Sequence, residues 1–217
     1  MATIFTDGTV YAKTKLNMIN QCLLAIGETP FPEGTVIEDL AFGTDADNAR
    51  RIVESTMVEV QARGWYFNTD YDFELLPDVN GFITLPPNVL RIDTGNSPDK
   101  NRYIEINGGV YDLAKKTYLI DKSVIADIIW LKDYEDLPTE AYEYISLRAA
   151  RKFQQKVIGS QEVSRFTEMD EMDALVNMQR VQLQVNDYIL LNRKASTRTH
   201  NGYIRQGLYS SPARRPF

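Results

Sequence analysis

The 217-residue chain is 43% apolar, so it is long and apolar enough to form the core of one domain, or of one compact domain with an insertion. Its net charge of −6 at pH 7 is uneven: residues 193–217 contain six basic residues and no acid, so the preceding residues carry −12. Because affinity for duplex nucleic acid comes largely from cations that neutralise phosphates, this acidic body is a poor candidate for tight DNA binding.

The first predicted helix follows an N-terminal segment whose structure the sequence does not decide. Residues 1–12 contain the turn signal Asp7-Gly8 and are compatible with a flexible arm or a short strand. From Thr14 to Gly27 apolar residues repeat at helical spacing, and two prolines follow the glycine closely. A helix of roughly 13 residues is therefore predicted here.

The clearest element of the sequence is a second, amphipathic helix that begins near Asp45. Its apolar residues recur at intervals of three and four and so lie on one face, while its charged residues lie mostly on the other. Thr44 or Asp45 can cap its N-terminus, and Gly64 supplies the left-handed residue that ends helices. Trp65 and Phe67 follow on alternate positions, so the chain is predicted to leave this helix extended, with both rings on one side.

After this helix the apolar pattern changes from a helical period to an alternating one, which is typical of strands. Asn107-Gly108 separates two alternating runs, and this pair favours a hairpin because both turn positions need positive φ. The run 124–131 is long and apolar enough to be the central strand. We therefore predict a meander of short antiparallel strands at 71–75, 82–85, 89–92, 103–106, 110–113 and 124–131.

Two more helices are predicted after the strands. Pro138 suits the first turn of a third helix, and Gly159 ends it. Ser160 can cap a fourth helix from Gln161 to about Leu191, which would be roughly 45 Å long at about 1.5 Å per residue. Its apolar residues cover more than one narrow stripe, so part of this long helix is expected to contact another chain.

Together these elements predict an α+β fold. Residues 1–64 and 137–192 are expected to form a four-helix bundle, and residues 65–136 an inserted small antiparallel β domain. Residues 193–217 are expected to form an extended basic C-terminal tail, disordered on its own because it combines glycine and proline with polar and basic residues.

The tail mixes cations with aromatic rings, and three interpretations are open. Arginine with tyrosine and phenylalanine anchors protein interfaces, and the same residue types line grooves that bind single-stranded nucleic acid. The third interpretation is an unstructured, solvated terminus that binds no partner. Docking to a protein is favoured because an acidic partner suits six cations, whereas the acidic body disfavours nucleic acid. The predicted docking residues are Arg193, Lys194, Arg198, Tyr203, Arg205, Tyr209, Arg214, Arg215 and Phe217.

No pattern predicts a catalytic residue, a metal ligand or a cofactor. Nucleophilic catalysis pairs a nucleophile with a positioned base, but the one histidine, His200, lies in the tail. The sequence also lacks the zinc, P-loop and dinucleotide motifs. In the fourth helix, four neighbouring acids are predicted to form a solvated face rather than a metal site: Glu168, Asp170, Glu171 and Asp173.

One enzymatic alternative is a pair of carboxylates facing each other across a cleft, as in glycosidases. Asp133, Glu135 and Asp136 lie between the predicted β domain and the third helix, where the edge of a groove is plausible. The favoured interpretation is that they are acids near a helix N-terminus, where the helix dipole stabilises them.

Cysteine usage and hydropathy suggest an intracellular, soluble protein. Cys22 is the only cysteine, so it cannot form an internal disulfide, and its place in an apolar helix predicts a buried thiol. No apolar run approaches the roughly 18 residues of a membrane span, and the N-terminus lacks the layout of a signal peptide.

Taken in order, several segments resemble tail tubular protein A, the adaptor or gatekeeper ring of short-tailed bacteriophages. No single segment is specific, but their order and spacing from about residue 15 to about residue 185 are. The similar segments are 20–30 (NQCLLAIGETP), 45–68 (opening DADNARRI and closing RGWYFN), 75–78, 107–112, 129–138, 149–153, and Gly159 with Glu162-Val163.

The resemblance implies a ring, expected to be a dodecamer, that joins the portal protein to the tail nozzle, tail tubular protein B. Phage DNA would pass through its channel without specific binding, and no membrane, metal or cofactor is implied. The resemblance places the protein in the virion, in the short tail, with assembly in the host cytoplasm, and directs the C-terminal tail to the portal. The alternative function is a virion-associated hydrolase acting on glycans of the host envelope.

Overall fold

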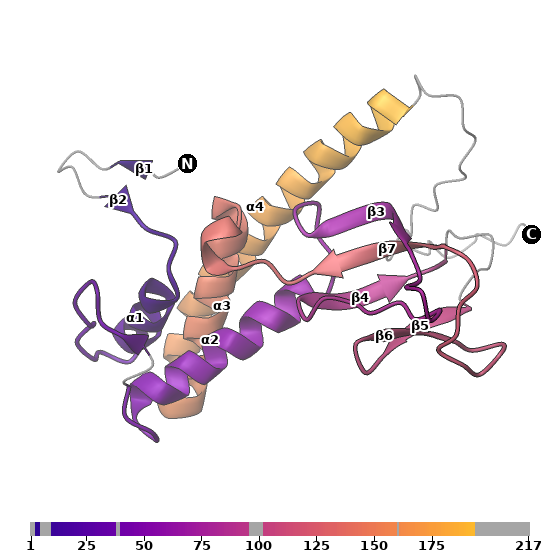
Figure 1. Cartoon of the computed structure of the whole chain (residues 1–217). Coiled ribbons are helices and arrows are strands. Elements are labelled where there is room, and N and C mark those ends of the chain that lie inside the picture. Colours follow the sequence, from indigo (N-terminus) through magenta and orange to yellow (C-terminus); the bar gives the residue numbers. More distant parts are fainter. Residues whose placement is uncertain (1–2, 5–9, 38–39, 96–101, 160, 194–217) are drawn as a thin grey trace, which may run out of the picture.

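The computed structural model describes residues 3–4, 10–37, 40–95, 102–159 and 161–193, and this part of the chain is a mixed α/β structure (Figure 1). The helices are α1 (Lys15–Ala25), α2 (Asp45–Gln61), α3 (Thr139–Val157) and α4 (Gln161–Arg193), and η2 (Tyr134–Asp136) is a 3-10 helix. The strands are β1 (Thr3–Ile4), β2 (Val10–Tyr11), β3 (Thr69–Leu75), β4 (Val89–Asp93), β5 (Tyr103–Ile106), β6 (Gly109–Asp112) and β7 (Val124–Trp130). Four helices with small antiparallel sheets agree with the predicted α+β class.

The first two helices begin where the sequence predicts. Thr14 and Thr44 each accept, through Oγ1, a hydrogen bond from the backbone N–H three residues later, at 3.2 and 3.3 Å. These bonds satisfy N–H groups that have no partner within the helix. After α2, Gly64 has a φ of +78°, and a Cβ at this position would lie 2.7 Å from the side chain of Ile129. Gly64 therefore allows both the left-handed turn and the close approach of β7.

The helical core is built around α3, which packs against α1, α2 and α4. Its Tyr142, Tyr144 and Phe153 are fully buried, and the Tyr142 hydroxyl donates a hydrogen bond to the Thr14 carbonyl at 2.9 Å. Cys22 of α1 is buried in the same cluster, and burial raises the pKa of its thiol to about 12. The prediction of a buried thiol is confirmed.

The main sheet has the strand order β3-β7-β4, with both outer strands antiparallel to β7. The central position predicted for 124–131 is confirmed, but the predicted meander is wrong, because β3 and β4 both pair with the last strand. Ala126 and Ile128 of β7 are buried in a second apolar cluster, separate from the helical core. The most apolar strand occupies the middle of the sheet, where burial is greatest.

The β5–β6 hairpin turns at Asn107 and Gly108, whose φ values of +53° and +72° confirm the turn predicted there. The strand predicted at 82–85 is wrong: Thr84 forms only an isolated bridge with Gly109. The Leu85 N–H donates to the Gly108 carbonyl at 2.8 Å. Two prolines follow at once, and because they lack N–H donors they cannot extend this pairing into a strand.

Two buried amide side chains join α2 to the sheet. Asn68 accepts a hydrogen bond from the Trp65 N–H at 2.8 Å and donates to the carbonyls of Gln61 and Trp130 at 3.0 and 2.7 Å. The Gln61 side chain in turn exchanges two hydrogen bonds with the backbone of Lys132, at 3.0 and 2.8 Å. The extended exit predicted after α2 is therefore wrong: residues 66–68 form a turn, which the Asn68 amide stabilises.

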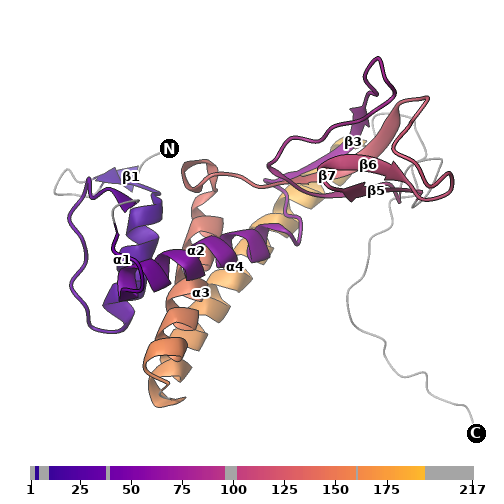
Figure 2. The same ribbon diagram turned by 60° about the horizontal axis from the view of Figure 1, so that its bottom comes forward.

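The helices and the main sheet lie beside each other, and α4 extends well beyond α3 (Figures 1 and 2). With 33 residues, α4 is about 50 Å long at about 1.5 Å per residue. Its C-terminal part runs past the end of α3, toward the end of the molecule that holds the sheet.

Candidate assembly surfaces

The described part of α4 has two opposite apolar faces. Ala174 and Met178 are buried against the helical core. At about 100° per residue, a second set of large apolar side chains points away from that face, and these are between 47% and 66% exposed. We call this set the α4 stripe: Met169, Met172, Val176 and Leu183.

A cluster of ion pairs fixes α4 to α3 and α3 to α2. Arg148 of α3 contacts Glu171 of α4 and Glu59 of α2, each at 2.6 Å. Arg151 also pairs with Glu171, and Lys152 pairs with Glu59. The prediction that Glu171 belongs to a solvated face is wrong, because this residue lies on the side of α4 that packs against α3. The other three acids of that predicted face, Glu168, Asp170 and Asp173, are exposed as predicted.

These ion pairs favour the ionised carboxylates. Hydrogen bonds from Lys152 and Arg148 lower the pKa of Glu59 to about 2. Burial opposes ionisation of Glu171, but hydrogen bonds from Arg151 and Arg148 outweigh it and lower the pKa of this carboxyl as well.

We predict that acid weakens the fold through Glu59. A carboxyl whose pKa is lowered in the folded state stabilises the fold above its unfolded pKa, about 4.3, and loses that contribution as the pH falls toward about 2. Glu59→Gln should therefore be less stable than the wild type at pH 6, and the difference should shrink at pH 3. Urea unfolding at the two pH values measures this, and an equal difference at both would contradict it.

A second exposed apolar surface lies at the tip of the β region. Leu76, Val79, Phe82 and Leu119 are exposed there, and Val79 is fully so. The side chain of Asp78 orders the loop of residues 76–82 by accepting hydrogen bonds from the N–H groups of residues 80 and 82, at 2.9 and 2.8 Å. The Ile120 N–H donates to the Gly81 carbonyl at 2.8 Å and joins this loop to the loop that contains Leu119. The tip is thus an ordered apolar surface.

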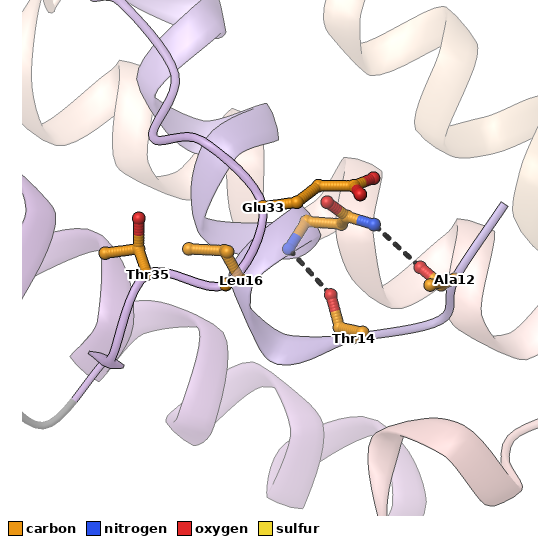
Figure 3. Close-up of a pocket in the computed structure, with 7 residues that line it drawn as sticks. Ala12, Thr14, Leu16, Glu33 and Thr35 are labelled. Carbon is orange, nitrogen blue, oxygen red and sulfur yellow. Dashed lines mark hydrogen bonds between the residues drawn. The ribbon is translucent and has the colours of Figure 1, made fainter. Parts of the chain in front are cut away.

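The described residues form two grooves large enough to be candidate active sites. The larger, of about 510 Å³, lies between the start of α1 and residues 33–35 (Figure 3). Asn17 donates its backbone N–H to the Thr14 hydroxyl and its side-chain amide N–H to the Ala12 carbonyl. Among the described residues that line this groove, Glu33 has an ionisable side chain. The second, of about 410 Å³, lies between α3 and α4 and is lined by Glu143, Leu147, Asp170, Asp173, Ala174 and Asn177. Neither groove is lined by a histidine, a cysteine or a lysine among the described residues.

Comparison with known proteins gives a clear result. The family model described as "Tail tubular protein" matches residues 16–188, which is most of the chain. The chain belongs to the tail tubular protein family. Tail tubular protein A of Klebsiella phage KP34 is 29% identical to it over 132 residues, which cover 61% of this chain and 67% of that protein.

Membership of the tail tubular protein family confirms the resemblance to tail tubular protein A. It makes the chain a structural protein of a bacteriophage tail, and therefore a component of the virion. In the described residues no helix has the length and hydropathy needed to cross a bilayer.

Most of the docking residues predicted for this tail tubular protein lie outside the described residues. Arg193 is the last residue of α4. The other eight are outside the part of the chain that the structure describes, so their role stays a prediction: Lys194, Arg198, Tyr203, Arg205, Tyr209, Arg214, Arg215 and Phe217. His200 lies outside it too.

The three acids considered for glycan hydrolysis lie in and next to η2. Asp133, Glu135 and Asp136 are exposed, and neither groove is lined by them. Over residues 10–37, 40–95, 102–159 and 161–193, no cluster of three or more histidine, cysteine or acidic residues could hold a metal ion. These three acids therefore do not form the carboxylate pair across a groove that the hydrolase alternative requires.

Sequence reasoning did not find the ion-pair cluster or the β tip. Helical spacing contains the signal for Glu171, because residues 171, 174 and 178 fall on one face of a helix. The β tip has no such signal, since single apolar residues in loops are common and only the folded chain brings Gly81 beside Leu119.

Proposed function

We propose that this protein is an adaptor of a short phage tail, joining the portal protein to the nozzle, tail tubular protein B. In this proposal it forms a closed ring, a dodecamer, around a channel for the phage DNA. Its role is structural, with no catalysis, and it assembles in the host cytoplasm before it becomes part of the virion.

The α4 stripe is the observation that carries the ring. Large apolar side chains exposed along one helix face favour an interface with another chain, because a monomer gains nothing by exposing them. The ion-pair cluster supports this proposal by fixing α4 on α3, so the stripe is presented in a defined orientation.

The charge of the chain suits a DNA conduit. Residues 1–192 carry a net charge of −12. An acidic surface has low affinity for phosphates, so duplex DNA could slide past it without being bound.

In this proposal each segment of the chain has its own structural role. Residues 1–64 and 137–192 form the helical bundle that packs into the ring, residues 65–136 form the inserted β domain, and residues 193–217 dock on the portal. The exposed apolar β tip suits contact with a second protein of the tail.

Deleting residues 193–217 tests the portal contact. Removing six cations and three aromatic rings should weaken binding to isolated portal by about 100-fold or more, because such residues supply most interface energy. Surface plasmon resonance measures the affinity, and the circular dichroism melting curve of the truncated chain should match that of the full chain. A second variant keeps the length of the tail and replaces its six basic residues by glutamine. Unchanged portal affinity of the truncated chain would refute this role of the tail.

A further inference from the structure

The outward edge of α2 is a second uncovered helix surface. Arg51, Ser55 and Val58 are exposed and Ala62 is half-buried. These four residues recur at intervals of four, three and four, so they form one line along the helix. We call this line the α2 edge.

The α2 edge and the α4 stripe lie on different sides of one subunit. Figures 1 and 2 show α2 and α4 along different sides of α3, with both helices running toward the end of the molecule that holds the sheet. Two different surfaces on one subunit can pair only head to tail, and such a contact closes into a ring when the rotation between copies allows it.

We infer that neighbouring copies of this chain meet through these two surfaces, with the α4 stripe of one copy packed in parallel against the α2 edge of the next. This inference rests on the proposed ring and names the surfaces that build it. Its occupant is a second copy of the same chain, and the complementarity of the two surfaces in size, charge and direction supports that choice.

The two surfaces are complementary in size. The α4 stripe consists of bulky side chains, whereas Ser55 and Ala62 of the α2 edge are small, with the exposed Val58 between them. A ridge of large side chains packs closely into a line of small ones on a facing helix. Val176 and Leu183 are seven residues apart on α4, and so are Ser55 and Ala62 on α2. One parallel alignment therefore sets Val176 opposite Ser55 and Leu183 opposite Ala62.

The same alignment is complementary in charge. It brings the exposed acid Asp173 near Arg51, at the start of the α2 edge. Opposite charges on facing helices fix partner and register more than they add affinity. Arg51 lies over the ring of Phe42, 5.3 Å from its centroid, and that ring is 87% exposed, so it extends the α2 edge with an aromatic anchor.

Parallel packing agrees with a ring of many copies. Each copy is turned only slightly from its neighbour, so helices that run in similar directions within one subunit also run in similar directions across a contact. An isologous contact between two α4 stripes would instead pair copies by a twofold axis and stop at a dimer.

Disulfide cross-linking in isolated tails tests the pairing. The native background is silent because Cys22 is buried, and burial raises the pKa of its thiol to about 12. The test variant carries Ser55→Cys and Val176→Cys. Diamide oxidises the facing thiols to a disulfide and is itself reduced, and a non-reducing gel then measures the mass of the linked species.

The expected result is a ladder of linked copies from the double variant, extending to the whole ring, with monomers from each single variant. The matched control is Val79→Cys with Val176→Cys, which introduces its second exposed thiol at the β tip and should stay monomeric. Dimers from Val176→Cys alone would overturn the pairing in favour of an isologous contact. An unlinked double variant in tails whose rings are visible by electron microscopy would overturn the pairing but keep the ring, whereas tails without a ring of this chain would overturn the proposed function itself.

Discussion

Replacing Asn68 by leucine is expected to lower the free energy of unfolding by about 3 to 5 kcal/mol. The side chain has nearly the same volume, so packing changes little, but three backbone groups lose a hydrogen bond. These are the Trp65 N–H and the carbonyls of Gln61 and Trp130, at 2.8, 3.0 and 2.7 Å from the amide. Of these, the Gln61 carbonyl still accepts one from the Gly64 N–H at 3.0 Å. A buried polar group left without a hydrogen bond costs about 1 to 3 kcal/mol.

Urea unfolding, followed by circular dichroism, measures this loss. Asn80→Ala is the matched control, because Asn80 is exposed in a loop and uses only its backbone N–H in the turn at Asp78. Its free energy of unfolding should stay within about 0.5 kcal/mol of the wild type. A loss below about 1 kcal/mol in Asn68→Leu would show that water or a rearranged turn replaces the amide.

Replacing Glu171 by glutamine is expected to cost about 2 to 3 kcal/mol of the free energy of unfolding. The carboxylate accepts hydrogen bonds from both Arg148 and Arg151, and it is largely buried where α4 packs on α3. Glutamine removes the negative charge and turns one acceptor into a donor, which takes the counter-charge from Arg151 and leaves Arg148 paired with Glu59 alone. Hydrogen bonds to charged groups contribute about 1.5 to 3 kcal/mol each, and loss of one member of a buried pair is strongly destabilising.

Glu168→Gln is the control for this prediction, since Glu168 lies one turn earlier on α4 and is exposed. Its unfolding midpoint should not change measurably. Limited proteolysis adds a local measurement: α4 of the Glu171→Gln variant should be cleaved faster than α4 of the control. Equal stability and equal cleavage of the two variants would contradict the role of the ion pairs.

The helices could be predicted from the sequence because their signals are local. Thr44 caps α2 and Gly64 follows its end, so two short patterns locate a helix that also has a regular apolar face. The β5–β6 hairpin is local in the same way, because the turn residues Asn107 and Gly108 determine the pairing on either side.

The sheet order and the ion-pair cluster could not be predicted, because they join residues far apart in the sequence. Alternation indicates that Val124–Trp130 is a strand, but it does not tell which strands it pairs with. The role of Asn68 could not be predicted either. An asparagine after a helix indicates a turn, but it does not indicate a hydrogen bond to β7. The acidic neighbours of Glu171 predict a solvated face, whereas its helical spacing from Ala174 and Met178 places it on the buried face.

The position of Arg148 between Glu59 and Glu171 determines where mechanical load goes. A force applied to the C-terminal end of α4 is transmitted along the helix axis to Glu171 and from there to Arg148, which also forms an ion pair with Glu59 of α2. Tension applied at that end is therefore shared by three helices at once, and α4 resists being peeled away from its neighbours one turn at a time.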